Sequence, residues 1–326
     1  PFASAAVITM ARQGRMPRPL DLPLALRPCD ADQAYAVQDA VVRERGEIAG
    51  WKVGAASPQA LPARAALTRD SVFVAPAGQA LNLPAAGFAV MGVEAELVYE
   101  LGIDLPDRPT PYSAAEVLAA MASVRAAIEV CDTRFAAWAQ QGAWSRLADQ
   151  ACHGALIVGS GTADVAAVQP LAQGVSLSVN GAVAVQHATW GNPAGDPLRL
   201  LTWLANEGAR SLGGLCAGQW VTTGSCTGTV LVAPGTVVVA DFPGLGRVVG
   251  DTDFVAGVRD TVTTRTDPFL GPFRTAVGDD VPFGAALEWG PKVLAKLIDA
   301  PMADRTLIHA NFPARPAEDV KGIRVV

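Results

Sequence analysis

The chain has 326 residues, of which 50% are hydrophobic and 17% charged, and its formal net charge at pH 7 is -6. This composition excludes general disorder, and the acidic balance argues against a nucleic-acid surface, which needs clustered lysine and arginine. The five cysteines are scattered and form no CxxC pair, so we expect no disulfide framework. This cysteine usage suits a reducing compartment, and we expect a cytoplasmic location. No apolar run is long enough to span a bilayer, and the N-terminal stretch lacks the basic start of a signal peptide.

The predicted elements begin with a helix over residues 30–46, which starts at an aspartate cap and ends at Gly46. The stretch "IAGWKVG" (48–54) then predicts a strand, and the alternating stretch "MGVEAELVYELG" (91–102) predicts another. Ser113, followed three residues later by a glutamate, predicts a second helix that opens with a capping box.

The second half of the chain is richer in strands. "RAAIEVCDTRF" (125–135) begins as a strand, and "VSLSVNGAVAVQ" (175–186) predicts a hairpin that turns at Asn-Gly. Asp196-Pro197 caps and opens a third helix, after which residues 220–249 are again rich in strands. Grouped strands with interspersed helices predict an α+β fold rather than a doubly wound sheet.

The strand at 91–102 carries carboxylates on one face, at Glu94, Glu96 and Glu100. Glu94 and Glu96 lie roughly 6.5–7 Å apart along such a strand, so both can reach one divalent cation, whose oxygen ligands lie at about 2.0–2.6 Å. A solvated strand face is the alternative explanation of this pattern.

Glu129 is a candidate third ligand, because it stands among aliphatic residues where an unpaired charge is expensive to bury. A buried ion pair with Arg125 or Arg134 would explain the same position. The pattern alone leaves both readings open.

An ordered set of motifs resembles the 2-keto-4-pentenoate hydratase family, within the fumarylacetoacetate hydrolase superfamily, over about residues 11–249. The motifs are "GWKVG" (50–54), "VEAEL" (93–97), "AIEVCDTR" (127–134), "LADQACHGALIVG" (147–159), "NGA" (180–182), "GNPAGDPLRLLTWLAN" (191–206), "AGQWVTTGSCTG" (217–228) and "ADFPGLGRV" (240–248). The resemblance implies a fumarylacetoacetate-hydrolase-like mixed β-roll with flanking helices. We therefore expect a catalytic domain at 76–250, with residues 1–75 packing on it. The chain changes character after Gly250 and becomes polar, which predicts an appendage at 251–326.

The resemblance also implies a Mg²⁺ or Mn²⁺ ion held by Glu94, Glu96 and Glu129, with no counterpart role for Glu100. Lys52 would face the substrate near the ion and stabilise negative charge or transfer a proton; a lysine whose stem packs while its ammonium reaches water is the alternative.

Two further segments are pocket candidates. "TTGSCTG" offers small residues and hydroxyls that could cradle a carboxylate, so Thr223, Gly224 and Ser225 are substrate-binding candidates, although an ordinary turn would have the same composition. Where the family has the pattern D-N-A-S-S-G, this chain has "DQACHG", which places His153 in the pocket motif. His153 is therefore a candidate general acid or base. A histidine packed in a turn is the alternative.

The expected activity is hydration of a 2-hydroxy-2,4-dienoic acid by a Mg²⁺- or Mn²⁺-dependent lyase, acting on a small acid and assembled as a homo-oligomer. Decarboxylation of a 2-oxo diacid, hydrolysis of an acylpyruvate, and a non-catalytic binding protein with an altered pocket are the alternatives. Residues 290–325 resemble a fragment of the survival-protein 5′-nucleotidase family, whose N-terminal aspartate pair has no matching context in this chain.

Overall fold

The computed structural model describes residues 1–76, 78–84, 87–138 and 140–252, which belong to one of two units of the chain, 1–258. All but the first two residues of the predicted appendage at 251–326 lie outside the described residues, as does the nucleotidase-like segment. Within the described ranges, no helix has both the length and the apolar character that crossing a membrane requires.

The larger sheet, sheet A, holds eight strands in the order β2-β1-β12-β5-β7-β8-β3, with β13 paired to β5. Most neighbours are antiparallel, but β1 runs parallel to β12 and β3 parallel to β8. Its strands are β1 (Ile48–Gly54), β2 (Ala63–Thr68), β3 (Val72–Val74), β5 (Gly92–Leu101), β7 (Met121–Cys131), β8 (His153–Thr162), β12 (Trp220–Ser225) and β13 (Val230–Leu231).

Sheet B has five strands in the order β10-β9-β14-β15-β4, and β6 and β11 form a separate short pair. These strands are β4 (Ala80–Asn82), β6 (Leu105–Pro106), β9 (Val175–Val179), β10 (Ala182–His187), β11 (Gly214–Leu215), β14 (Val237–Phe242) and β15 (Gly246–Asp251). The α-helices are α1 (Phe2–Arg12), α2 (Ala31–Arg45), α3 (Ala114–Ala119), α4 (Ala143–Ala148) and α5 (Pro197–Trp203), and α5 continues as a π-helix, η7 (Leu204–Gly208).

Sheet A curls until its two edges approach each other. The edge strands β2 and β3 follow one another in the chain, joined only by the three-residue 3-10 turn η2 (Arg69–Ser71). Such a link spans at most about 14 Å. Side chains from five strands of the sheet form one buried apolar cluster, and they can meet only on the concave side of a curled sheet. The cluster consists of Leu67, Val98, Ala127, Leu156, Val158 and Trp220.

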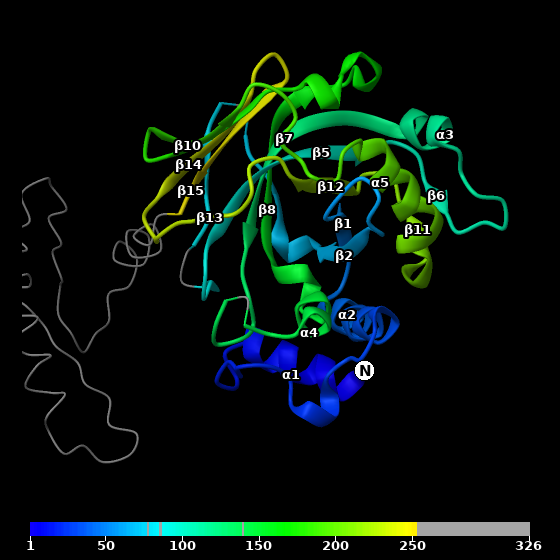
Figure 1. Ribbon diagram of the computed structural model, residues 1–326, viewed down its shortest axis with the longest axis vertical. Helices are drawn as coiled ribbons and strands as arrows, with labels where there is room; N and C mark the ends of the chain where they lie inside the picture. Colours follow the sequence, from blue (N-terminus) through cyan, green and yellow to red (C-terminus); the bar gives the residue numbers. More distant parts are fainter. Residues whose placement is uncertain (77, 85–86, 139, 253–326) are drawn as a thin grey trace, which may run out of the picture. The chain divides into compact units, whose positions relative to one another are not determined.

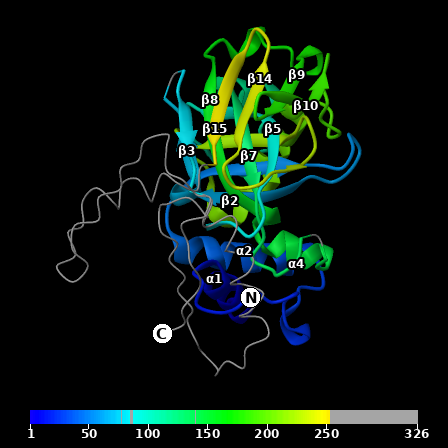
Figure 2. The ribbon, with the colours of Figure 1, turned by 90° about the vertical axis from the view of Figure 1, so that its left-hand side faces the viewer.

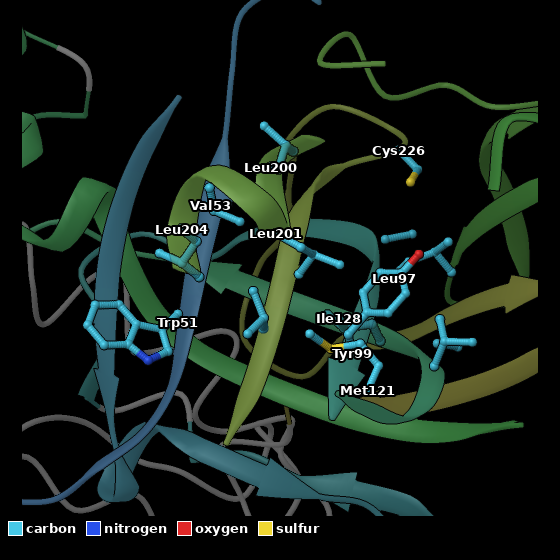
Figure 3. Packing of buried hydrophobic residues seen from close by; sticks show 14 of the residues in the cluster. Trp51, Val53, Leu97, Tyr99, Met121, Ile128, Leu200, Leu201, Leu204 and Cys226 are labelled. Atoms are coloured by element: carbon cyan, nitrogen blue, oxygen red, sulfur yellow. The ribbon is translucent and has the colours of Figure 1, made fainter. Parts of the chain in front are cut away.

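The convex side of sheet A carries the main hydrophobic core. Leu97 and Tyr99 of β5 and Ile128 of β7 point to this side, where they pack with apolar residues of sheet B and of α5 (Figure 3). Leu200, Leu201 and Leu204 gather near Val53 of β1 in the same view. Because the apolar residues of β5 alternate with its glutamates, this packing turns the glutamates to the concave side.

Helices α1, α2 and α4 form a layer beside sheet A (Figures 1 and 2). They share a second apolar cluster, in which Ile8 of α1 and Val41 of α2 meet Leu147 of α4. The predicted α+β fold with a mixed β-roll and flanking helices is therefore confirmed.

Several local predictions are confirmed in detail. The Asp30 side chain caps α2 by accepting a hydrogen bond from the Gln33 amide, and Gly46 ends the helix. The Ser113–Glu116 capping box opens α3. The hairpin of β9 and β10 turns at 180–181, where both residues have positive φ as a two-residue type I′ turn requires.

Candidate metal centre

The three predicted ligands lie on one face of sheet A, on its neighbouring strands β5 and β7. Glu94 of β5 lies directly opposite Glu129 of β7, and Glu96 follows two residues later on the same face. Glu129 is 0% exposed and Glu96 is 1% exposed, whereas Glu94 is half-buried. The alternative of a fully solvated strand face is wrong, and the half-buried Glu94 is the ligand candidate nearest to solvent.

Glu129 is paired, but with neither arginine that the sequence offered. Its Oε1 atom accepts a hydrogen bond from Lys52 Nζ at 2.7 Å and lies 2.9 Å from His153 Nδ1. Arg134 instead pairs with Asp149, and Arg125 lies nearer to Glu100. The predicted alternative of an arginine partner for Glu129 is therefore wrong.

The second oxygen of Glu129, Oε2, is buried and has no hydrogen-bond partner among the described residues. Leaving a charged acceptor buried and unpaired costs several kcal/mol, so such an atom calls for an explanation. The three carboxylates outnumber the nearby ammonium of Lys52 by two charges, which one divalent cation would neutralise. Both features fit a site for such a cation.

Glu96 and Glu94 are held by donors from β12 and from the segment that follows it. The Thr222 hydroxyl and the Gly224 amide donate to Glu96 Oε2, the latter at 2.9 Å, and the Thr229 hydroxyl donates to Glu94 Oε1. Gly224 has φ +91°, a conformation that favours glycine and that turns its amide toward the carboxylate.

The electrostatics of the three carboxyl groups differ. Burial, together with the charge of Glu129, raises the pKa of Glu94 and raises that of Glu96 well above its ordinary value. Burial also opposes ionisation of Glu129, but Lys52 and His153 outweigh it and lower its pKa to about 2. Glu129 is thus ionised, while the two carboxyl groups on β5 tend to retain a proton that a bound cation would displace.

Lys52 projects from β1 into the same space. Its ammonium bonds Glu129 Oε1 and the Ala151 carbonyl, the latter at 3.1 Å, and the side chain is 18% exposed. Burial disfavours the ammonium, but the carboxylates around it, Glu129 foremost, reverse this and raise the pKa of Lys52. The lysine is a fixed cation beside the carboxylates, so the alternative of an ammonium that only reaches water is wrong.

His153 begins β8 behind Glu129 and is 0% exposed. Its Nδ1 faces Glu129, and its Nε2 lies 3.1 Å from the Ser71 hydroxyl, in the turn that joins the sheet edges. Burial lowers the pKa of His153 to about 4 despite the opposing effect of Glu129, so the ring is neutral near pH 7. A neutral ring donates from Nδ1 to Glu129 and accepts at Nε2 from Ser71.

The altered motif "DQACHG" forms a left-handed turn. Gln150, Ala151 and Cys152 have φ values of 49°, 48° and 63°, which non-glycine residues rarely adopt. The buried Gln150 side chain anchors the turn by donating to the Ala66 carbonyl and accepting from Arg12 and Arg45. This turn aims the Ala151 carbonyl at Lys52.

The substrate-binding candidates point in different directions. The Thr223 hydroxyl donates to the Leu97 carbonyl of β5 and not to a carboxylate, and Ser225 Oγ accepts from the Thr227 amide. The hydroxyls that donate to the carboxylates are those of Thr222 and Thr229, which sequence reasoning missed. A register shift between Thr222 and Ser225 interrupts the alternation of β12, so side-chain direction could not be read from period-two spacing.

A cysteine also lies at this site. Ligand atoms of Glu94, Glu129 and Cys131 lie within 4.8 Å of one another, and Cys131 follows Glu129 on the same face of β7. Glu100, at the other end of β5, accepts from the Ser123 hydroxyl and lies 3.8 Å from Arg125. Its place matches the expectation that it has no part in the acidic cluster.

Comparison with known proteins supports this arrangement of the fold. The chain is 30% identical over 229 residues to a 2-keto-4-pentenoate hydratase from Burkholderia vietnamiensis, a match that covers 67% of this chain and 85% of that protein. The solved structure of 4-oxalocrotonate decarboxylase from Pseudomonas putida, complexed with magnesium and adipate, superposes with a TM-score of 0.66 at 24% identity, covering 77% and 96% of the two chains. No family model matches the sequence.

The solved structure shares the fold of this chain. Because it is 30% identical to the relative from Burkholderia vietnamiensis, the chain belongs to the 2-keto-4-pentenoate hydratase family.

A short segment has a different relationship. It is 57% identical over 53 residues to the 5′-nucleotidase SurE from Rhizorhabdus wittichii, which covers 16% of this chain and only 21% of that protein. A second SurE protein, from Erythrobacter litoralis, is matched over 48% of its length. The predicted resemblance of residues 290–325 to a fragment of that family is confirmed, and the chain spans less than half of either relative.

Proposed function

We propose that the protein is a metal-dependent lyase that hydrates a 2-hydroxy-2,4-dienoic acid to a 4-hydroxy-2-oxo acid. Membership of the hydratase family supports this reaction class. The observation that carries the proposal is the buried cluster of three glutamates around Lys52, in which Glu129 Oε2 has no protein partner within the described residues.

Glu94, Glu96 and Glu129 would hold a Mg²⁺ or Mn²⁺ ion, which, when bound, supplies Lewis-acid polarisation of a substrate oxygen. The donors that hold the glutamates prepare this role. Thr222 and the Gly224 amide occupy one oxygen of Glu96 and leave its other oxygen for a ligand.

Lys52 would act as a fixed positive charge. Its raised pKa keeps the ammonium protonated at neutral pH, so in the free protein it is an electrostatic group rather than a base. An ammonium at this position would stabilise the carboxylate of the substrate and the negative charge that develops when the dienol proton leaves.

His153 would act on Glu129 rather than on the substrate. The ring is fully buried and both its nitrogens are engaged, one with Glu129 and one with Ser71. We therefore propose that His153 orients Glu129 and fixes its charge, as outer-shell partners of metal ligands do.

The test supplies the protein with Mg²⁺ and 2-hydroxypenta-2,4-dienoate and follows the loss of dienol absorbance, with mass spectrometry of the product. A product heavier by one water supports hydration. Turnover of a 2-oxo diacid with CO₂ release, and none of the dienoate, would replace the proposal by a decarboxylase of the same fold.

Turnover by the wild type separates an enzyme from a binding protein with an altered pocket, and the Glu96→Gln variant tests the metal site. Loss of both metal binding and turnover in this variant is expected, because its carboxylate is one of the three proposed ligands. Absence of turnover by the wild type with every acid tested, although the metal binds, would instead favour the non-catalytic reading.

A further inference from the structure

Cys131 lies at the proposed metal site, and the role inferred for it rests on that proposed function. Besides the three predicted glutamates, this thiol lies within the acidic cluster: its Sγ and one oxygen each of Glu94 and Glu129 are within 4.8 Å of one another. Cys131 is 5% exposed and sits opposite Gly92 of β5. Because Gly92 has no side chain, the Thr229 side chain packs directly over Gly92, beside Cys131.

A second observation points to a ligand at this place. Glu129 is 0% exposed, and its Oε2 has no hydrogen-bond partner among the described residues, although Lys52 and His153 both engage its Oε1. A cation bound to Oε2 would satisfy this unpaired oxygen, and Cys131 lies two residues further along the same face of β7.

The spacing suits a metal that takes sulfur. Zinc binds thiolate sulfur at about 2.3 Å and carboxylate oxygen at about 2.0–2.2 Å, so tetrahedral ligand atoms lie roughly 3.6 Å apart. Closing from at most 4.8 Å to that separation takes about 1 Å, which small side-chain rotations of Glu94, Glu129 and Cys131 would together supply.

We propose that Cys131 is a metal ligand alongside Glu94 and Glu129, and that the site therefore binds thiophilic divalent cations such as Co²⁺, Zn²⁺ and Cd²⁺ more tightly than Mg²⁺. A thiolate is a softer donor than a carboxylate and selects these ions, whereas an all-carboxylate set suits Mg²⁺ and Mn²⁺. The carboxylates still accept Mg²⁺, so the thiol widens the range of ions toward the thiophilic ones.

The experiment titrates the metal-stripped, full-length protein with Co²⁺ and records the near-ultraviolet absorption of thiolate-to-cobalt charge transfer. The wild type is expected to show this band. Cys131→Ser and Cys131→Ala should lose it, and Cys29→Ser, which removes an exposed thiol, should keep it. Calorimetry should show Cd²⁺ affinity falling at least about tenfold in Cys131→Ser, with a smaller change for Mg²⁺.

The outcomes separate this inference from the function on which it rests. Tight Co²⁺ binding by the wild type without the band, or a band that survives in both Cys131 variants, overturns the ligand role and leaves the carboxylate site standing. No binding of any divalent ion by the wild type overturns both. Absence of the band in the wild type overturns the ligand role by itself, and using both Cys131→Ser and Cys131→Ala guards against one variant that fails to fold.

Discussion

The two carboxylate oxygens of Glu129 have different hydrogen-bond partners, and this difference prepares Glu129 to bind a cation. One oxygen takes Lys52 and His153, which keeps the side chain ionised, and the other is left without a protein donor in the described part of the chain. A carboxylate fixed in this way is preorganised for a cation, because its charge and rotamer are set before the cation arrives.

Replacing Glu129 by Gln is expected to abolish Mg²⁺ binding and turnover. It also leaves Lys52 as a buried cation without its anion, which should destabilise the fold by about 3–5 kcal/mol. Calorimetry with Mg²⁺ and urea unfolding measure the two effects.

Glu100→Gln is the matched control, since Glu100 lies on β5 but bonds Ser123 away from the cluster. It should bind Mg²⁺ like the wild type. Equal Mg²⁺ affinity in Glu129→Gln and Glu100→Gln would remove Glu129 from the metal site.

The left-handed turn at 150–152 could not be predicted from the local sequence, because it contains no glycine. Ala151 holds φ 48° without the freedom of glycine, and its carbonyl accepts from Lys52. An L-residue in this conformation costs about 1–2 kcal/mol, and a β-branched side chain costs more.

We expect Ala151→Val to destabilise the protein by about 2 kcal/mol, and Ala151→Gly to be neutral or slightly stabilising, because glycine adopts this conformation freely but has a more disordered unfolded state. Chemical unfolding of the two variants measures this difference. A valine variant as stable as the wild type would mean that this turn does not adopt the left-handed conformation.

The capping box of α3 gives a pH-dependent prediction. The Ser113 amide, followed by Arg108 and the Ser113 hydroxyl, lowers the pKa of Glu116 to about 2. An unfolded glutamate titrates near 4.3, so the ionised group stabilises the fold above that pH, and the effect is lost as pH falls toward 2.

Glu116→Gln tests this effect, because glutamine can keep the capping hydrogen bond while losing the charge. The variant should be less stable than the wild type at pH 7, and the difference in unfolding free energy should be smaller at pH 3. A difference that grows at pH 3 would contradict the assignment.

In the whole molecule, local features could be predicted from the sequence, whereas contacts between residues far apart in the chain could not. Caps, the Asn-Gly hairpin and the alternation of β5 are local, so they could be predicted from neighbouring residues. The partner of Glu129 could not, because Lys52 is 77 residues away and reaches it only when sheet A curls. The role of Thr222 was hidden by an irregularity in β12, which arises from tertiary pairing.

The closure of sheet A and the metal site share one contact, between Ser71 and His153. Ser71 belongs to the turn that joins the edge strands, and its hydroxyl lies 3.1 Å from His153 Nε2 and 2.9 Å from the Thr68 carbonyl oxygen. The hydroxyl donates to the Thr68 carbonyl, and its single proton cannot serve Nε2 of the neutral ring at the same time, so the two acceptors compete for it.

Ser71→Ala should therefore act on stability and on metal affinity together. Leaving a buried imidazole nitrogen unpaired costs about 1–3 kcal/mol, and loosening an outer-shell partner lowers Mg²⁺ affinity by about tenfold. Ser4→Ala is the matched control: Ser4 is a buried serine of α1 whose hydroxyl donates to the Leu26 carbonyl, outside sheet A. It should lose comparable stability in urea unfolding while binding Mg²⁺ like the wild type. If both variants bind Mg²⁺ equally well, the contact between the sheet edges supports the fold alone and has no part in preparing Glu129.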